Sequence, residues 1–530
     1  MKPDCLLLVE YKNTQEIGII KNHLEKTLSE VFSIVRAHRP SSIEPFYKTR
    51  IRSDDKGTKN SLTLTSMVLA TSLLDNGVKF KLYEDENIIE KYHAAIEGHI
   101  RNSTEYVCLS TTFIQNIVDL EKMVHSIHEI DKKNSVKIII GGPMLFLWGT
   151  RIIEKLDDVF CYCYGDMDYD FGFILSNIIK YKNPEKYLQH NVHNKKEYFS
   201  YHAAVGNLNH LPIPRWESIE EIDINDNGFS INKSSSVIPV EERRGCVNKC
   251  AFCSYHTLKN RMMKSPERIL QELMNIKAAG YSKVNFIGSE FFLPLSNCRN
   301  VLEKIINQNL SLEIMVFGRI DVLADNFDVI DLLADAGVSR IYFGAETGDE
   351  NLLRGMNKKY RLDLIPHVVD ALRKKNIDIC ASFILGFPGE NEYSINKTIE
   401  YIIECNFSTL EFHALQVIPF TPLYNERKSY DLKVFGNSWK HSTMALNEIP
   451  QVFGRLISAI YSKCSSNLTH LDDLVEAHFF FKENARQAKE SITRHVYKLI
   501  YDIFSRDGDD NVVAILDSWE ELKTHLDYIV

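Results

Sequence analysis

The sequence predicts an α/β protein with an open parallel sheet at the N-terminus, a partial barrel of six β/α units in the centre, and a helical domain at the C-terminus. The first observation is that short apolar, strand-like runs alternate with amphipathic helical runs over residues 1–190. The second is that this alternation restarts at residue 237 and continues to 428. Residues 191–236 are rich in turn-forming residues and are interpreted as a linker, and residues 429–530 are predicted to be helical.

The composition is typical of a multidomain globular protein. The chain has 530 residues, of which 44% are hydrophobic and 25% are charged. Its net charge of −9, without a long basic run, argues against a nucleic-acid-binding surface. No stretch stays apolar for about 18 residues, so no membrane span is expected. Eleven cysteines and the lack of a secretory signal indicate a cytoplasmic protein with mostly free thiols.

The N-terminal region contains five predicted strands separated by helical runs such as residues 62–77. The strands cover residues 5–11, 78–86, 105–112, 136–143 and 159–166. In an open parallel sheet, ligands bind beyond the carboxyl ends of the strands. The residues expected at that edge are Ser110, Thr111, Thr112, Gly141, Gly142, Pro143, Gly165 and Asp166.

The central region contains six predicted strands, each followed by a helix except the last. The first strand begins at residue 237, and the others cover 283–288, 312–318, 339–344, 377–386 and 409–418. Ser265 is a predicted N-cap, with Pro266 at the first helical position. Six parallel strands can curl into a partial barrel, with the active residues at the carboxyl ends of the strands.

Three cysteines, Cys246, Cys250 and Cys253, follow the first barrel strand with the spacing C-x3-C-x2-C. Together with His256 they would form a closed Cys3His zinc site. Alone they would hold a [4Fe–4S] cluster with one thiolate fewer than usual, which leaves one iron open to a further ligand. The spacing leaves both alternatives open, and either group could also serve a structural or sensing module.

The cysteine loop and its place in the chain resemble the radical SAM (S-adenosylmethionine) superfamily. The family signature is C-x3-C-x-aromatic-C, and Phe252 stands at the aromatic position of CVNKCAFC. The family places this loop after the first strand of a partial (β/α)6 barrel, and the resemblance covers about residues 237–425. It implies that Cys246, Cys250 and Cys253 ligate a [4Fe–4S] cluster whose open iron binds SAM. It also implies cleavage of SAM to a 5′-deoxyadenosyl radical by one electron, from a donor such as flavodoxin or ferredoxin.

Later motifs extend the resemblance, because they follow successive strands in the order of the family. Gly288-Ser289-Glu290 resembles the Gly-Gly-Glu motif that binds the amino group of SAM, with Ser289 in place of the second glycine. The other cofactor-binding positions that the resemblance implies are Phe252, Arg319, Glu346 and Ser382.

An open α/β region ahead of such a barrel resembles the cobalamin-binding class of radical SAM enzymes. The pieces CLSTT, IIIGGP and YCYGDMD have counterparts in that class, with Gly165–Asp168 in place of Gly-Glu-Gly-Glu. The resemblance implies a Rossmann-like, cobalamin-binding domain over residues 1–190, a radical SAM barrel over 237–428, and cobalamin contacts by Ser110, Thr111, Thr112, Gly141 and Gly142. It further implies methylation of an unactivated centre in a small-molecule or peptide substrate.

The alternative within the same superfamily is a cobalamin-independent epimerase or rearrangement enzyme. An epimerase needs a hydrogen donor, and Cys380 shares one face of the fifth barrel strand with Ser382 and Ile384. Cys380 is therefore a candidate catalytic thiol, although a free cysteine is more often a small buried residue. Trp439 and His441 belong either to the barrel mouth or to the start of a surface helix.

Overall fold

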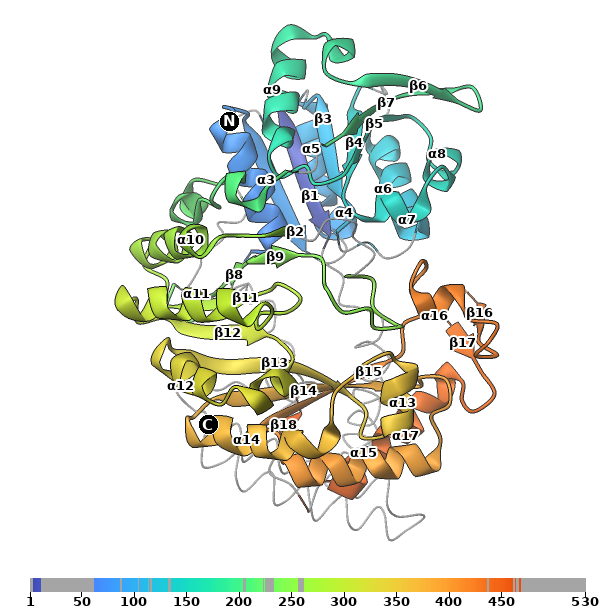
Figure 1. The fold of residues 1–530 in the computed structure, drawn as a ribbon. Coiled ribbons are helices and arrows are strands. Elements are labelled where there is room, and N and C mark those ends of the chain that lie inside the picture. Colours follow the sequence, from blue (N-terminus) through green and yellow to red (C-terminus); the bar gives the residue numbers. More distant parts are fainter. Residues whose placement is uncertain are drawn as a thin grey trace, which may run out of the picture.

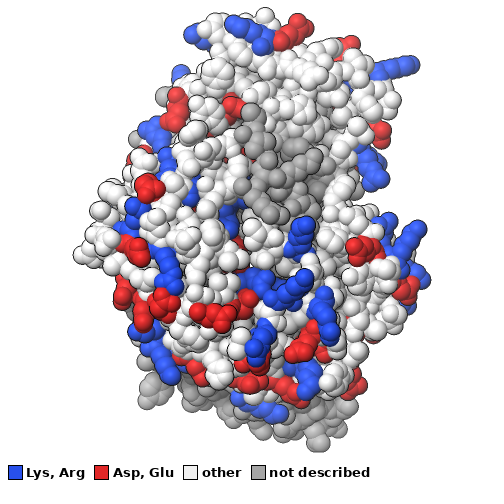
Figure 2. All heavy atoms as spheres, in the orientation of Figure 1, with Lys and Arg blue, Asp and Glu red and all other residues white. Residues whose placement is uncertain are grey.

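The computed structural model contains two seven-stranded sheets, which lie one above the other in Figure 1. The described residues are 3–10, 62–85, 88–102, 104–112, 114, 117–131, 135–203, 206–222, 224, 233–255, 262–435, 438–460, 463 and 467–468. Within this part of the chain, no helix is both long and apolar enough to cross a membrane. On the face shown in Figure 2, acidic and basic side chains are interspersed.

The N-terminal sheet has the strand order β2-β1-β3-β4-β5-β7-β6. Its first five strands are parallel and are β1 (Cys5–Glu10), β2 (Phe80–Asp85), β3 (Tyr106–Ser110), β4 (Lys137–Gly141) and β5 (Val159–Tyr164). All five coincide with predicted strands. The order reverses between β1 and β3, which is where ligands bind in open sheets of this topology.

Helices cover both faces of this sheet because its strands are apolar on both sides. Leu6 and Leu8 of β1 belong to one hydrophobic cluster, whereas Leu7 and Val9 belong to another. The first cluster lies under α4 (Ile88–Lys91), α5 (His93–Arg101), α6 (Ile117–Ile130), α7 (Met144–Trp148) and α8 (Arg151–Lys155). The second lies under α3 (Leu64–Asp75) and α9 (Asp170–Tyr181).

Two further strands extend the sheet past the predicted boundary at residue 190. β7 (Lys196–His202) pairs parallel with β5, and β6 (Gln189–His193) pairs antiparallel with β7. Aromatic packing joins these two strands to the rest of the sheet, since the ring centroids of Phe199 on β7 and Phe160 on β5 lie 5.1 Å apart. Residues 191–202, which were predicted to begin the linker, thus belong to the first sheet, and the sheet is mixed instead of purely parallel.

The second sheet is parallel throughout, in the order β18-β15-β14-β13-β12-β11-β8. Its strands are β8 (Val237–Val240), β11 (Lys283–Phe286), β12 (Glu313–Phe317), β13 (Val338–Glu346), β14 (Asp378–Leu385), β15 (Thr409–Ala414) and β18 (Asn467–Leu468). The six predicted barrel strands are confirmed, and β18 is an additional short edge strand.

The helices of the barrel lie outside the sheet, as Figure 1 shows. They are α10 (Pro266–Ala278), α11 (Leu295–Asn307), α12 (Asp328–Asp335), α13 (Glu350–Gly355), α14 (Ile365–Lys374) and α15 (Glu392–Cys405). The predicted start of α10 is confirmed, because the Ser265 side chain accepts a hydrogen bond from the backbone N–H of Arg268.

The described part of the C-terminal region is not entirely helical. After the short helix α16 (Pro422–Asn425), which ends the predicted barrel, it contains a hairpin of β16 (Lys433–Phe435) and β17 (Ser438–Lys440), and the helix α17 (Ile449–Ile460). The hairpin forms because Trp439 is buried, with its indole N–H donating to the carbonyl of Leu415 at 2.7 Å. Residues 469–530, which hold most of the predicted helices, lie outside the described residues.

Candidate active site

The cysteine loop lies at the carboxyl end of β8. A short antiparallel pair, β9 (Arg243–Arg244) and β10 (Met262–Met263), joins the two ends of the loop. Residues 256–261 lie outside the described residues, and with them His256, the fourth ligand of the zinc alternative.

The three thiols of the loop lie near one another. Cys246 is buried, and Cys250 and Cys253 are half-buried. Burial and, to a smaller extent, the neighbouring thiols Cys250 and Cys246 raise the pKa of Cys253 to about 11. Burial also raises the pKa of Cys250, whereas the positive charges of Lys358 and Arg319 lower it. The loop therefore lies near cationic side chains from other parts of the barrel, and these favour thiolates at a metal.

The number of thiols is the part of the site that bears on the kind of metal group. Among the described residues, no group of three or more His, Cys, Asp or Glu side chains is arranged to hold a metal ion. Three thiols would ligate three irons of a [4Fe–4S] cluster and leave the fourth iron without a protein ligand. A zinc ion would need a fourth ligand such as His256, which lies outside the described residues.

Hydrogen bonds join the loop to the segments that follow β13 and β15. The Ala251 N–H donates to the carbonyl of Met356 at 2.8 Å, and the Leu423 N–H donates to the carbonyl of Ala251 at 2.9 Å. The side chain of Asn357 donates to the carbonyl of Lys249 at 2.7 Å. Phe252 is partly buried and packs on the hydrophobic core. The signature aromatic residue thus helps to fix the loop in place.

The Gly288-Ser289-Glu290 segment follows β11 and contacts the start of the cysteine loop. Ser289 Oγ donates to the carbonyl of Gly245 at 2.8 Å. The carboxylate of Glu290 accepts from the backbone N–H groups of Phe292 and Arg319, each at 3.2 Å. Glu290 is 1% exposed, so its carboxylate orders the backbone at the ends of β11 and β12.

Glu242 is a site residue that sequence reasoning missed. Its Oε2 accepts from the Gly288 N–H at 3.0 Å, and a Cβ at Gly288 would lie 2.1 Å from Oε1. Only glycine therefore fits at position 288. Burial raises the pKa of Glu242 to about 7, and Oε1 has no hydrogen-bond partner. No local pattern marks Glu242, because its contact with Gly288 spans 46 residues.

Arg319 and Glu346 lie at the ends of the third and fourth barrel strands. The Arg319 guanidinium binds Asp321 and donates to Asn248 Oδ1, inside the cysteine loop, at 3.2 Å. Glu346 is buried and ion-paired with Lys358, whose ammonium also donates to the carbonyl of Gly344. Glu346 has φ of +63°, a conformation that non-glycine residues adopt only where the surroundings hold them. Sequence reasoning missed Lys358.

Ser382 and Cys380 lie on the barrel-facing side of β14. Phe383, on the opposite face of β14, belongs to the hydrophobic core and stacks on Phe412, with the ring centroids 5.5 Å apart. Ser382 pairs in register with Gly344, next to the Lys358 ammonium. Cys380 is 2% exposed and lies five residues before Leu385, which places it about 16 Å below the carboxyl end of the strand.

Trp439 and His441 cover the ends of β14 and β15, as the barrel-mouth alternative predicted. Their rings are stacked, with the ring centroids 5.2 Å apart. Gly386 lies against the indole, because a Cβ at this position would lie 2.2 Å from the ring of Trp439. His441 Nε2 donates to the carbonyl of Gly386 at 3.0 Å, and its Nδ1 lies 3.0 Å from Thr443 Oγ1. Burial lowers the pKa of His441. Both ring nitrogens are occupied, so His441 holds the loop in place.

A second candidate site lies at the carboxyl ends of β3 and β4. The Thr111 N–H donates to the carbonyl of Gly141 at 2.7 Å, and the hydroxyls of Ser110 and Thr112 lie 3.0 Å apart. Gly142 has φ of +116°, and a Cβ there would lie 2.6 Å from Thr111 Oγ1. That hydroxyl is buried without a hydrogen-bond partner. The structure thus brings together Ser110, Thr111, Thr112, Gly141 and Gly142, the five residues for which the resemblance implied cobalamin contacts.

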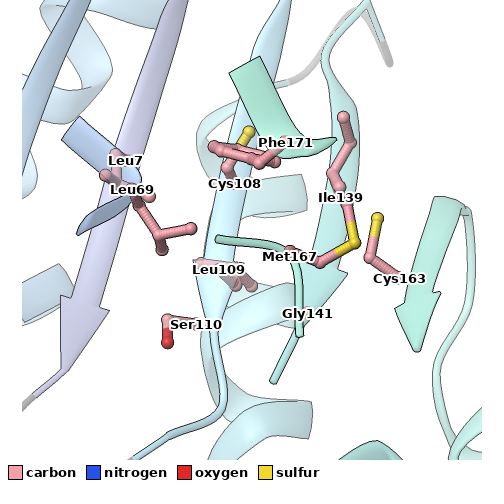
Figure 3. A pocket seen from close by; sticks show the side chains of 10 residues that line it. All are labelled: Leu7, Leu69, Cys108, Leu109, Ser110, Ile139, Gly141, Cys163, Met167 and Phe171. Atoms are coloured by element: carbon pink, nitrogen blue, oxygen red, sulfur yellow. The ribbon is translucent and has the colours of Figure 1, made fainter. Parts of the chain in front are cut away.

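A small cavity of about 40 Å³ lies between this edge and the helices α3 and α9 (Figure 3). Its lining residues are Leu7, Leu69, Cys108, Leu109, Ser110, Ile139, Gly141, Cys163, Met167 and Phe171. In Figure 3, the side chain of Met167 extends towards Cys163. The lining of the cavity is mostly apolar, with a polar group at Ser110.

Residues 243–402 of this chain match the radical SAM superfamily. A curated relative, "Uncharacterized methyltransferase sll1242" of Synechocystis sp., is 27% identical over 230 residues, which are 41% of this chain and 40% of the relative. The chain thus spans less than half of that relative.

Two solved structures share the fold over nearly the whole chain. The radical SAM methyltransferase TsrM from Kitasatospora setae has a TM-score of 0.61 at 11% identity, covering 99% of both chains. OxsB, described as a cobalamin-dependent S-adenosylmethionine radical enzyme, has a TM-score of 0.60 at 14% identity, covering 99% of this chain and 80% of its own. Residues 243–402 are therefore a radical SAM domain, within a chain that shares its overall fold with TsrM and OxsB.

Proposed function

We propose that this protein is a cobalamin-dependent radical SAM methyltransferase. The observation that carries the proposal is the arrangement of two sites in one chain. One is a loop of three thiols at the carboxyl end of the barrel strands, and the other is the cavity at the carboxyl end of the first sheet. The arrow of β1 points towards the barrel in Figure 1, so the cavity edge of the first sheet faces the second.

The first site suits a [4Fe–4S] cluster and SAM. Cys246, Cys250 and Cys253 would ligate the cluster, while Lys358 and Arg319 offset its negative charge. When bound, the cluster supplies the electron that cleaves SAM, and cobalamin supplies a carrier for the methyl group. The buried ends of the barrel strands exclude water from the radical.

The second site suits cobalamin. Thr111 offers a buried hydroxyl without a partner, and Gly142 lies close to it because a Cβ at Gly142 would lie 2.6 Å from Thr111 Oγ1. The solved structures of OxsB and TsrM with cobalamin bound, whose fold this chain shares, support the same assignment.

The alternative, a cobalamin-independent epimerase, gains no support at Cys380. That thiol lies deep in the barrel, about 16 Å below the strand ends, and hydrogen transfer requires contact with the substrate radical. We propose a small-molecule or peptide substrate and an electron donor of the flavodoxin or ferredoxin type. The methyltransferase name of the curated relative also favours methyl transfer.

Anaerobic reconstitution of the full chain with iron, sulfide and SAM tests the proposal. Wild type should bind iron, form 5′-deoxyadenosine under a chemical reductant, and retain added cobalamin through gel filtration. Cys250→Ala should abolish 5′-deoxyadenosine, whereas Cys298→Ala, which alters a buried thiol on α11, should not. Formation of 5′-deoxyadenosine by Cys250→Ala would refute the cluster assignment, and loss of cobalamin on the column would refute the methyltransferase assignment.

A further inference from the structure

Arg244 joins the two parts of the chain directly. It lies on β9, two residues before Cys246, and its guanidinium contacts two carboxylates at the end of β5 in the first sheet. One nitrogen lies 3.0 Å from Asp166 Oδ2, and another binds Asp168 Oδ2. The same guanidinium makes two bonds of 2.8 Å to Glu241 in its own part of the chain.

This contact is specific, and it is shielded from water. The side chains of Arg244, Asp168 and Glu241 are 16%, 19% and 18% exposed, respectively, whereas Asp166 is 48% exposed. A guanidinium that binds a carboxylate through two nitrogens has a fixed orientation. If the two sides moved apart, each would be left with an uncompensated charge that is shielded from water. The intact ion pair therefore opposes independent movement of the two sides.

Each side of the contact continues into one of the two candidate sites. Met167, between the two aspartates in the sequence, lines the cavity of the first sheet. The turn begins at Gly165, which has φ of +92° and whose Cβ would lie 3.2 Å from Ala203. On the barrel side, β9 pairs with β10 and so holds the ends of the cysteine loop. The Arg244–Asp168 ion pair therefore joins the residue that follows Met167 in the chain to a residue two positions before Cys246.

We propose that Arg244 is a positioning residue that couples the cavity of the first sheet to the cysteine loop. A ligand that enters the cavity contacts Met167, which lines it, and the neighbouring aspartates bind Arg244. Occupation of either site therefore changes the affinity of the other, and linkage requires the same factor in both directions. This inference rests on the proposed function, because it takes cobalamin and SAM as the two ligands.

The test is a thermodynamic cycle on the reconstituted full chain. The Kd of labelled SAM is measured by equilibrium dialysis with and without saturating hydroxocobalamin, for wild type, Arg244→Gln and Asp168→Asn. In wild type, the Kd of SAM with hydroxocobalamin and the Kd without it should differ by about fivefold or more. In both variants, the ratio of these two Kd values should fall to about one. Arg299→Gln, which removes an ion pair between α11 and α12 far from the cavity, should keep the wild-type ratio.

The outcomes separate coupling from a merely structural contact. Iron content equal to wild type establishes that each variant is folded, and Asp168→Asn supplies the test from the N-terminal side if Arg244→Gln does not fold. A ratio of one in wild type, or a wild-type ratio in folded Asp168→Asn, would overturn the inference. Wild type that binds SAM but not hydroxocobalamin would instead overturn the proposed function, which makes the two failures distinguishable.

Discussion

The side chain of Arg319 donates a hydrogen bond to Asn248 Oδ1 over 3.2 Å, which ties the end of the third barrel strand to the cysteine loop. Asn248 lies between Cys246 and Cys250, so this bond fixes the part of the loop that carries two of the three thiols. Arg319 is itself held by Asp321 and by the carbonyl of Lys359. The orientation of the loop thus depends on a residue 71 positions away.

Arg319→Met should therefore retain iron but cleave SAM slowly. Loss of charge-assisted hydrogen bonds at a half-buried site costs about 1.5–3 kcal/mol, which corresponds to a rate roughly 10- to 100-fold lower if it acts on the transition state. The measurement is 5′-deoxyadenosine formation per iron–sulfur cluster. Arg361→Met is the matched control, because Arg361 pairs with Asp363 in the same way on the surface. Equal rates for both variants would contradict a role for Arg319.

Lys358→Met should make the cluster harder to reduce. The Lys358 charge acts on Cys250, and its removal leaves the buried carboxylate of Glu346 without its partner. More negative charge around a cluster lowers its reduction potential, here by an amount on the order of tens of millivolts. A redox titration followed by electron paramagnetic resonance measures the shift. The double variant Lys358→Met/Glu346→Gln should recover part of it, and an unchanged potential in the single variant would refute the electrostatic assignment.

Gly142→Ala should abolish cobalamin retention without loss of iron. The added Cβ would lie 2.6 Å from Thr111 Oγ1, and φ of +116° is strained for alanine, at about 1–3 kcal/mol. The change distorts the edge of the first sheet and leaves the barrel untouched. The readout is corrinoid absorbance after gel filtration. Gly98→Ala on α5 has nothing within 4 Å of the new Cβ and should bind cobalamin like wild type.

Glu390→Gln should stabilise the protein above pH 7. Burial raises the pKa of Glu390 from 4.5 to about 7, so the folded state holds the proton more tightly than the unfolded chain does. The stability that this group contributes is complete below pH 4.5 and is lost as the pH rises to about 7. The full loss amounts to ~3 kcal/mol.

Thermal unfolding across this pH range compares Glu390→Gln with wild type. The glutamine can still accept the hydrogen bond that the Gly386 N–H makes to the carboxylate. The thermal midpoint of the variant should exceed that of wild type above pH 7 and approach it below 4.5. Glu303→Gln, at an exposed position on α11, should show no such trend. A constant difference at every pH would contradict the assignment of the titration to Glu390.

The strands of both sheets could be predicted because each is a short apolar run between helical runs. β4 and β14, for example, coincide with the predicted strands 136–143 and 377–386. The β6–β7 hairpin could not, since its sequence is polar and its aromatic residues matter only when they pack on β5. The helical domain expected after residue 429 missed the β16–β17 hairpin, in which Trp439 packs against the distant Gly386.

The site was predicted in its short motifs and not in its long-range partners. The three cysteines, Glu346 and the Ser110–Thr112 edge stand out in the sequence because strand ends and spacing mark them. Lys358 and Glu242 do not, because a charged residue in a polar stretch has no periodicity that marks it as buried. Lys358 contacts Glu346, 12 positions away, and Glu242 contacts Gly288, 46 positions away. Only the folded barrel brings these residues together.

The central claim is that one chain holds both an iron–sulfur cluster that cleaves SAM and a cobalamin. The most direct measurement determines iron, corrinoid and 5′-deoxyadenosine on a single anaerobic preparation after gel filtration. Wild type should contain one cluster and one cobalamin per chain and form 5′-deoxyadenosine, and Cys250→Ala should lose only the cluster and the product. A wild-type preparation that forms 5′-deoxyadenosine without retaining corrinoid, or retains corrinoid without forming 5′-deoxyadenosine, would contradict the account.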